Sequence, residues 1–150
     1  MMFQYSLDND GKYPHGQSST EVFQQLIDQS YVADPSVFYF PMPGKTKPTS
    51  NKLKPENVCS DVTDGAQSGD PDNLPVVFTT GYKINYETDF GHATLAYPLT
   101  KPALPGIVVG FMNNSSSFVP ATADGVLLIN STFDSKGKTY RQLTPNGPLH

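Results

Sequence analysis

Four aspartates lie in the segment of the sequence best suited to metal chemistry. The candidate ligands are Asp61, Asp64, Asp70 and Asp72, in a stretch that also contains turn-forming Gly, Pro and Asn residues. Carboxylate oxygens are ligands that calcium prefers, so calcium is the cofactor that this stretch would hold. The alternative, which we prefer at this point, is a solvated and turn-rich surface loop.

A second acidic motif, Asp8-x-Asp10-Gly11, opens like a calcium-binding loop. Such a loop closes with a glutamate that binds the ion through both oxygens, but Ser19 stands at that position. The motif therefore predicts a turn that ends a helix. Gly, Asn and Asp suit such a turn because they tolerate a positive φ.

The sequence contains no motif typical of an active site. It has no G-x-S-x-G, no H-E-x-x-H and no glycine-rich phosphate loop. Asp89-Phe90-Gly91 copies a kinase triplet without the lysine and catalytic loop that a kinase needs. Cys59 is the one cysteine, and no histidine is placed by the sequence as its partner. We therefore expect a protein that is not an enzyme.

The composition indicates an ordinary globular domain with few charges. Of the 150 residues, 37% are hydrophobic and 16% are charged, and the net charge is −4. Nucleic-acid partners need clustered Lys and Arg, so we expect none. The short basic run over residues 45–54 is interpreted as a solvated loop. The length predicts a single domain over residues 1–150.

Two helices are expected near the start of the chain. Residues 1–7 favour a helix, with Met2, Phe3 and Leu7 as its apolar contacts, and we interpret them as the end of a longer helix because nothing caps their beginning. The second helix begins at Ser18, whose side chain would cap it, with Glu21 completing a capping box. Its apolar stripe consists of Val22, Phe23, Leu26, Ile27 and Tyr31.

Strands are expected after the helices. A short aromatic strand is predicted over 37–40, followed by a long surface loop over 44–74. The remaining predicted strands cover residues 76–80, 82–86, 107–112, 117–119, 126–130, 132–133 and 140–143. This order predicts an α+β fold, in which a truncated N-terminal helix and a second short helix pack on a mostly antiparallel sheet.

The segment Tyr5-Ser6-Leu7-Asp8-Asn9-Asp10-Gly11-Lys12-Tyr13-Pro14 resembles a motif of type II secretion major pseudopilins. In that family a Y-x-L-D-N-G-x-Y-P run stands where the long N-terminal helix ends. The matching residues are Tyr5, Leu7, Asp8, Asn9, Gly11, Tyr13 and Pro14. Residues 34–41 are similar to a D-P-x-V-F-x-C-P run of pilin-like proteins, with Phe40 in place of the Cys, and the predicted hairpin over 107–119 resembles theirs loosely. The close resemblance covers residues 3–41.

This resemblance implies a structural role. A pseudopilin or type IV pilin-like subunit carries an apolar N-terminal helix behind a prepilin site, where it is cleaved and methylated. That helix anchors the subunit in the inner membrane and later bundles in a filament of pilin-like subunits that supports protein secretion. The present residues would form the head, in the periplasm or on the filament surface. The family has a calcium site in a loop of the head domain. Its ligands do not correspond residue by residue to positions of this sequence, so the resemblance assigns no calcium ligand here.

An alternative function is a β-rich module of a cell-surface protein that binds carbohydrate or protein. Tyr and Asn residues near 82–97 and 111–118 motivate this hypothesis. Within the first hypothesis, both a major and a minor subunit, of a pilus or of a pseudopilus, are consistent with the sequence.

Overall fold

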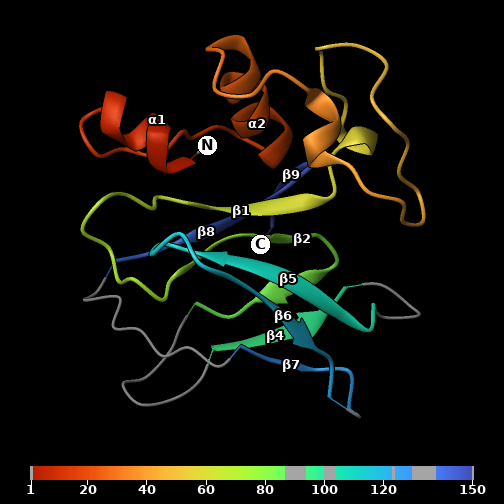
Figure 1. The fold of residues 1–150 in the computed structure, drawn as a ribbon. Helices are drawn as coiled ribbons and strands as arrows, with labels where there is room; N and C mark the ends of the chain where they lie inside the picture. The colour runs from red at the N-terminus through yellow and green to blue at the C-terminus, as the bar shows by residue number, and fades with distance from the viewer. Residues whose placement is uncertain (1, 87–93, 100–103, 123, 130–137, 150) are drawn as a thin grey trace.

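The structure is a computed structural model that describes residues 2–86, 94–99, 104–122, 124–129 and 138–149 (Figure 1). The expected strand over 132–133 and the triplet over 89–91 lie outside these residues. The helical elements are α1 (Met2–Asp8), α2 (Ser19–Asp28) and the 3₁₀ helices η1 (Pro35–Phe38) and η2 (Pro55–Asn57).

The strands form two antiparallel sheets. The larger sheet has the order β6-β5-β2-β1-β8-β9, and the smaller has the order β3-β4-β7. The strands are β1 (Ser60–Asp64), β2 (Pro75–Thr79), β3 (Tyr82–Ile84), β4 (Thr94–Pro98), β5 (Gly106–Phe111), β6 (Ser116–Pro120), β7 (Leu127–Ile129), β8 (Arg141–Thr144) and β9 (Gly147–Leu149). The predicted α+β class, with helices on a mostly antiparallel sheet, is confirmed.

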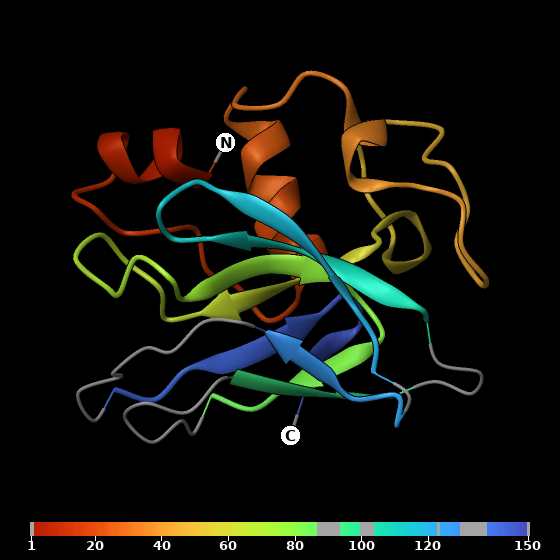
Figure 2. The same ribbon diagram turned by 60° about the horizontal axis from the view of Figure 1, so that its bottom comes forward.

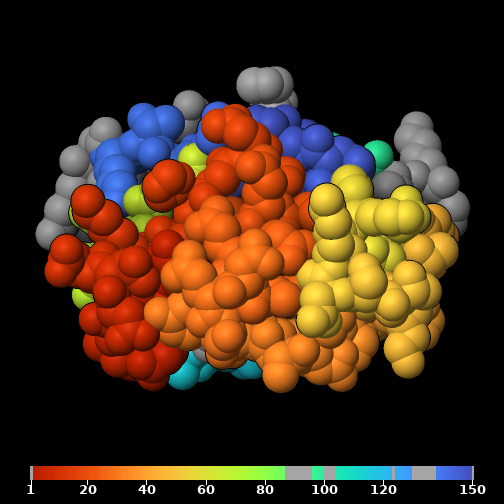
Figure 3. Space-filling model, turned by 90° about the horizontal axis from the view of Figure 1, so that it is seen from above, coloured from red at the N-terminus to blue at the C-terminus, as the bar shows by residue number. Residues whose placement is uncertain are grey.

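The elements stack in three layers, with the larger sheet in the middle (Figures 1 and 2). The helices lie over one face of this sheet, and the smaller sheet lies against the other. Seen from the helix side, the N-terminal part of the chain, red to yellow in Figure 3, forms one continuous surface.

Strand register determines which side chains face each layer. Val62 of β1 lies opposite Val77 and Leu143, and these three residues face the helices. The neighbouring positions on β1 therefore face the smaller sheet, because successive side chains of a strand point to opposite faces. Asp61 and Thr63 occupy those positions and are buried.

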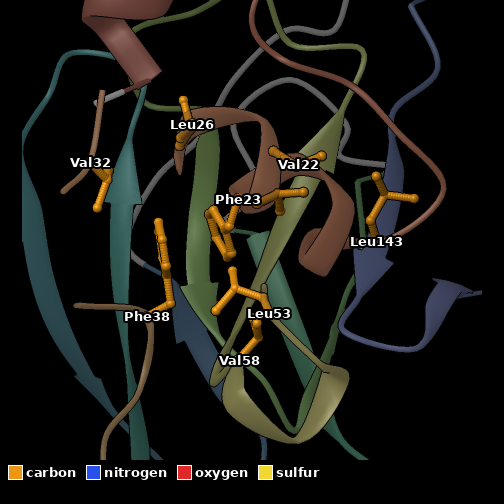
Figure 4. Packing of buried hydrophobic residues seen from close by; sticks show 9 residues of the cluster. Val22, Phe23, Leu26, Val32, Phe38, Leu53, Val58 and Leu143 are labelled. Atoms are coloured by element: carbon orange, nitrogen blue, oxygen red, sulfur yellow. The ribbon is translucent and has the colours of Figure 1, made fainter. Parts of the chain in front are cut away.

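The core beneath the helices forms as the apolar stripe predicted. Val22, Phe23 and Leu26 point from α2 toward the strands (Figure 4). The rings of Phe23 and Phe38 stack with centroids 4.4 Å apart. The Ser18 hydroxyl accepts a 3.1 Å bond from the Glu21 N–H, so the predicted N-cap is confirmed.

Two of the segments predicted from the sequence differ in the structure. The 44–74 segment is not one long surface loop, because β1 lies within it and pairs with strands on both sides. Residues 37–40 do not form a strand. The first two belong to η1, which covers Pro35–Phe38, and residues 39–40 are in no strand. Asp34 caps η1 by accepting a 2.9 Å bond from the Ser36 N–H, and the proline at its first position favours helix initiation.

Candidate functional site

The motif of residues 5–14 forms a tight turn at the end of α1. The Ser6 carbonyl accepts bonds from the N–H groups of Asn9 at 3.2 Å and Gly11 at 2.8 Å. The Asn9 side chain donates to the Tyr5 carbonyl at 2.8 Å. Gly11 has a φ of 80°, which a residue with a side chain adopts only with strain. The acidic motif is therefore a helix-ending turn, as predicted.

Aromatic contacts attach this turn to the body of the protein. The rings of Tyr5 and Tyr31 lie 5.5 Å apart, and the Tyr31 hydroxyl donates to the Asp8 carboxylate at 2.6 Å. Tyr13 and Pro14 are buried. Burial, and to a smaller extent the charge of Asp70, raises the pKa of the Tyr13 phenol. The motif residues thus hold α1 in a defined position.

The outer side of α1 is apolar and exposed. Met2 and Tyr5 are partly buried against the core under α2. Phe3 and Leu7, which were predicted to be apolar contacts of this helix, keep 51% and 62% of their surface exposed. These two residues are four positions apart and so share one face of the helix. Phe3 also lines a groove of about 340 Å³ together with Val37 of η1.

The four candidate calcium ligands are dispersed. Asp61 is buried between the sheets, whereas Asp64 pairs with Arg141 at 2.9 Å. Asp70 pairs with Lys138 at 2.8 Å and shares a hollow with the exposed Asp72. Within the described ranges, no three His, Cys, Asp or Glu residues are grouped to hold a metal ion. The structure therefore gives the predicted calcium site no support.

Asp61 belongs instead to a buried link between the two sheets. Its carboxylate accepts a 2.7 Å bond from the Gln142 amide. The same amide nitrogen donates to the Tyr82 carbonyl at 2.7 Å, and the amide oxygen accepts from the Ile84 N–H at 2.8 Å. Gln142 thus joins β8 to β3 through a side chain. No local signal in the sequence indicates this role of Gln142, since its partners are 58 to 81 residues away.

Burial controls the protonation of Asp61. Its side chain has 0% exposure, and the loss of water raises the pKa of the carboxyl to about 6. The bond from Gln142 and the positive charge of Lys45 oppose this rise. Desolvation dominates because the buried carboxylate loses more hydration than its hydrogen bonds and the charge of Lys45 restore.

A cleft opens beside this link. It has a volume of about 530 Å³ and is lined by residues 83–86, in and after β3, and by residues 138–142, before and in β8, with Tyr97 and Leu149. The Tyr86 and Tyr140 rings lie 5.9 Å apart. Burial raises the pKa of Tyr140 to about 12. Of the tyrosines that motivated a binding module, Tyr82 is buried, while Tyr97 is exposed.

Comparison with known proteins finds no family model, curated protein or solved structure that matches this chain. Among the described residues, no helix combines the length and the apolar character needed to cross a bilayer. The membrane anchor implied by the pseudopilin resemblance therefore stays a prediction.

Proposed function

We propose that this chain is the head domain of a type II secretion pseudopilin or type IV pilin-like subunit, which self-assembles into a filament that supports protein secretion. The observation that carries this proposal is the arrangement of α1. One side of the helix is attached to the core through Met2 and Tyr5, while Phe3 and Leu7 on the other side remain exposed. An apolar face left open on a fixed helix is suited to contact with another subunit.

In such a subunit, an apolar segment preceding residue 1 would continue α1 into the inner membrane and later into the filament core. The head would lie in the periplasm or on the filament surface. The turn bonds around Ser6 and the Tyr31–Asp8 bond would keep the head at a fixed angle to that rod. Assembly of this kind needs no catalytic residue, and we propose no enzymatic activity.

Substitution of Leu7 by glutamate tests this proposal in the native host. Leu7 is exposed, so the head should fold normally, whereas a charge on the open face of α1 should reduce secreted protein in the medium at least tenfold. Ala33→Glu is the matched control, because Ala33 is also exposed and follows α2. Unchanged secretion in Leu7→Glu, or in a strain that lacks the gene, would contradict the proposal.

A second candidate function is carbohydrate binding, supported by the cleft between the sheets. Tyr97 is 44% exposed at its edge, and an exposed aromatic ring beside polar groups can stack on a sugar ring. Tyr97→Ala should then abolish binding on a glycan array, while Leu128→Ala, an exposed apolar residue of β7, should not. An array on which the wild-type head binds no glycan would exclude this function.

A further inference from the structure

The β5–β6 hairpin ends the larger sheet at an edge without charge. β6 is the terminal strand of the sheet order, and residues 104–122 contain no charged side chain. Natural sheets usually protect an edge with charges, prolines, bulges or covering segments, because an open edge can pair with another strand. Here Pro120 ends the strand, and beyond it Ala121 bridges to Leu127. The four residues Ser116–Val119 have no such protection within the described part of the chain.

Backbone geometry shows which groups of β6 point outward. Ala121 N–H donates to the Pro105 carbonyl, so the odd-numbered residues of this strand bond toward β5. In an antiparallel ladder the residues between them turn their N–H and C=O groups to the opposite side. Those residues are Ser116, Phe118 and Pro120, and Pro120 has no N–H to donate. The outward donors are therefore those of Ser116 and Phe118.

An apolar surface adjoins this edge. Phe118 lies opposite Val108, and both side chains are exposed, Phe118 by 61%. The Phe118 ring lies across Gly106, where an added Cβ would come within 2.5 Å of the ring. The glycine thus leaves room for the ring to lie flat on the sheet. This position fixes Phe118 on the open face, so ordering it costs little when a partner binds.

We propose that this edge pairs with the same edge of a second copy of the chain, antiparallel and about a twofold axis. Ser116 of one copy lies opposite Phe118 of the other, and Ser117 lies opposite its own counterpart. This register gives every outward donor of both copies a carbonyl partner. It also leaves Pro120 outside the paired segment. The two Phe118 rings become diagonal neighbours, within reach of one another across the new strand pair.

The missing charge favours a second copy of the chain as the occupant over a strongly charged partner. A strongly acidic or basic partner would find no countercharge on residues 104–122. Two copies, each with a net charge of −4, can meet here without placing like charges in contact. The contact is isologous, as in most closed dimers. It does not rest on the filament proposal, and because the paired segment is short we expect a transient dimer.

Cysteine cross-linking tests the register directly. Ser117 would face its counterpart in a non-hydrogen-bonded pair, with Cα atoms about 4.5 Å apart, which is within the range of a disulfide. In a Cys59→Ala background, Ser117→Cys should form a covalent dimer under mild oxidation. Ser115→Cys is the matched control, because its counterpart would be displaced along the strands by about 13 Å. We expect at least tenfold less dimer from it.

A second pair of variants tests the apolar contact. Phe118→Glu added to Ser117→Cys should reduce cross-linking at least tenfold, because it places two like charges together. Leu128→Glu should leave cross-linking unchanged, since Leu128 is similarly exposed but lies on β7. Equal cross-linking by Ser115→Cys and Ser117→Cys, or none by either at millimolar protein, would overturn the proposal. That comparison decides the question even if Phe118→Glu fails to fold.

Discussion

At the scale of single residues, Gln142 connects the two sheets. Its amide bonds to Asp61 on one strand and to the backbone of Tyr82 and Ile84 on another. A buried polar group left without a partner costs about 1–3 kcal/mol, so this side chain satisfies groups that would otherwise destabilise the interior. The arrangement has an unfavourable free energy at Asp61, because this carboxylate is charged and fully buried at neutral pH.

Asp61→Asn should therefore change how stability depends on pH. The folded-state pKa of about 6 lies above the ordinary value of 3.8, so the folded protein holds the proton more tightly. The resulting stability is complete below about pH 4 and is lost as the pH rises to about 6. A shift of this size corresponds to ~3 kcal/mol. Urea unfolding should show that wild-type stability falls by up to this amount from pH 4 to pH 7 relative to Asp61→Asn.

The matched control is Asp72→Asn, because Asp72 is exposed. It should retain the wild-type difference between pH 4 and pH 7. If Asp61→Asn loses as much stability over this pH range as the wild type, then Asp61 does not carry the buried charge that the structure gives it.

At the scale of elements, the helices and strands that could be predicted from the sequence are those whose signals are local. The α2 helix was predicted because its cap, Ser18, and its apolar stripe lie within a few turns. The β1 strand was missed because Ser-Asp-Val-Thr-Asp resembles a surface loop, although Asp61 and Thr63 are buried with distant partners. A strand whose buried residues are polar, with partners far along the chain, lacks the alternation of apolar residues from which strands are predicted. Strands β4 and β9 were also missed, in segments interrupted by prolines and glycine.

The pairing of β5 with β6 depends on a glycine for steric reasons. A Cβ at Gly106 would lie 2.5 Å from the Val119 carbonyl and from the Phe118 ring. The backbone cannot move away without disturbing the ladder, so Gly106→Ala should destabilise the protein by about 1–3 kcal/mol. Gly110→Ala is the control on the same strand, because its nearest contact is 3.4 Å away. Thermal unfolding that ranks Gly110→Ala as equally destabilising would contradict this account of the hairpin.

At the scale of the whole molecule, the layers separate three surfaces. The helix layer exposes Phe3 and Leu7, the larger sheet exposes its β6 edge, and the cleft opens between the sheets. The turn beside the first surface was predicted from the sequence, because the motif of residues 5–14 is continuous, but the exposure of Phe3 and Leu7 was not. The cleft could not be predicted, because its walls come from residues 83–86 and 138–142, which only the fold brings together. For the same reason, aspartates that are neighbours in the sequence have separate partners, since Asp61 bonds to Gln142, Asp64 to Arg141 and Asp70 to Lys138.

Mass spectrometry of the native protein, isolated from membranes of its host, tests the filament proposal most directly. The proposal requires a mature N-terminus upstream of residue 1 that is cleaved, N-methylated and followed by an apolar segment of about 20 residues, long enough to span a bilayer. The expected result is a methylated N-terminal peptide of that composition, joined without interruption to the sequence of α1. An unmodified N-terminus with no apolar segment between it and Met2 would contradict the proposal.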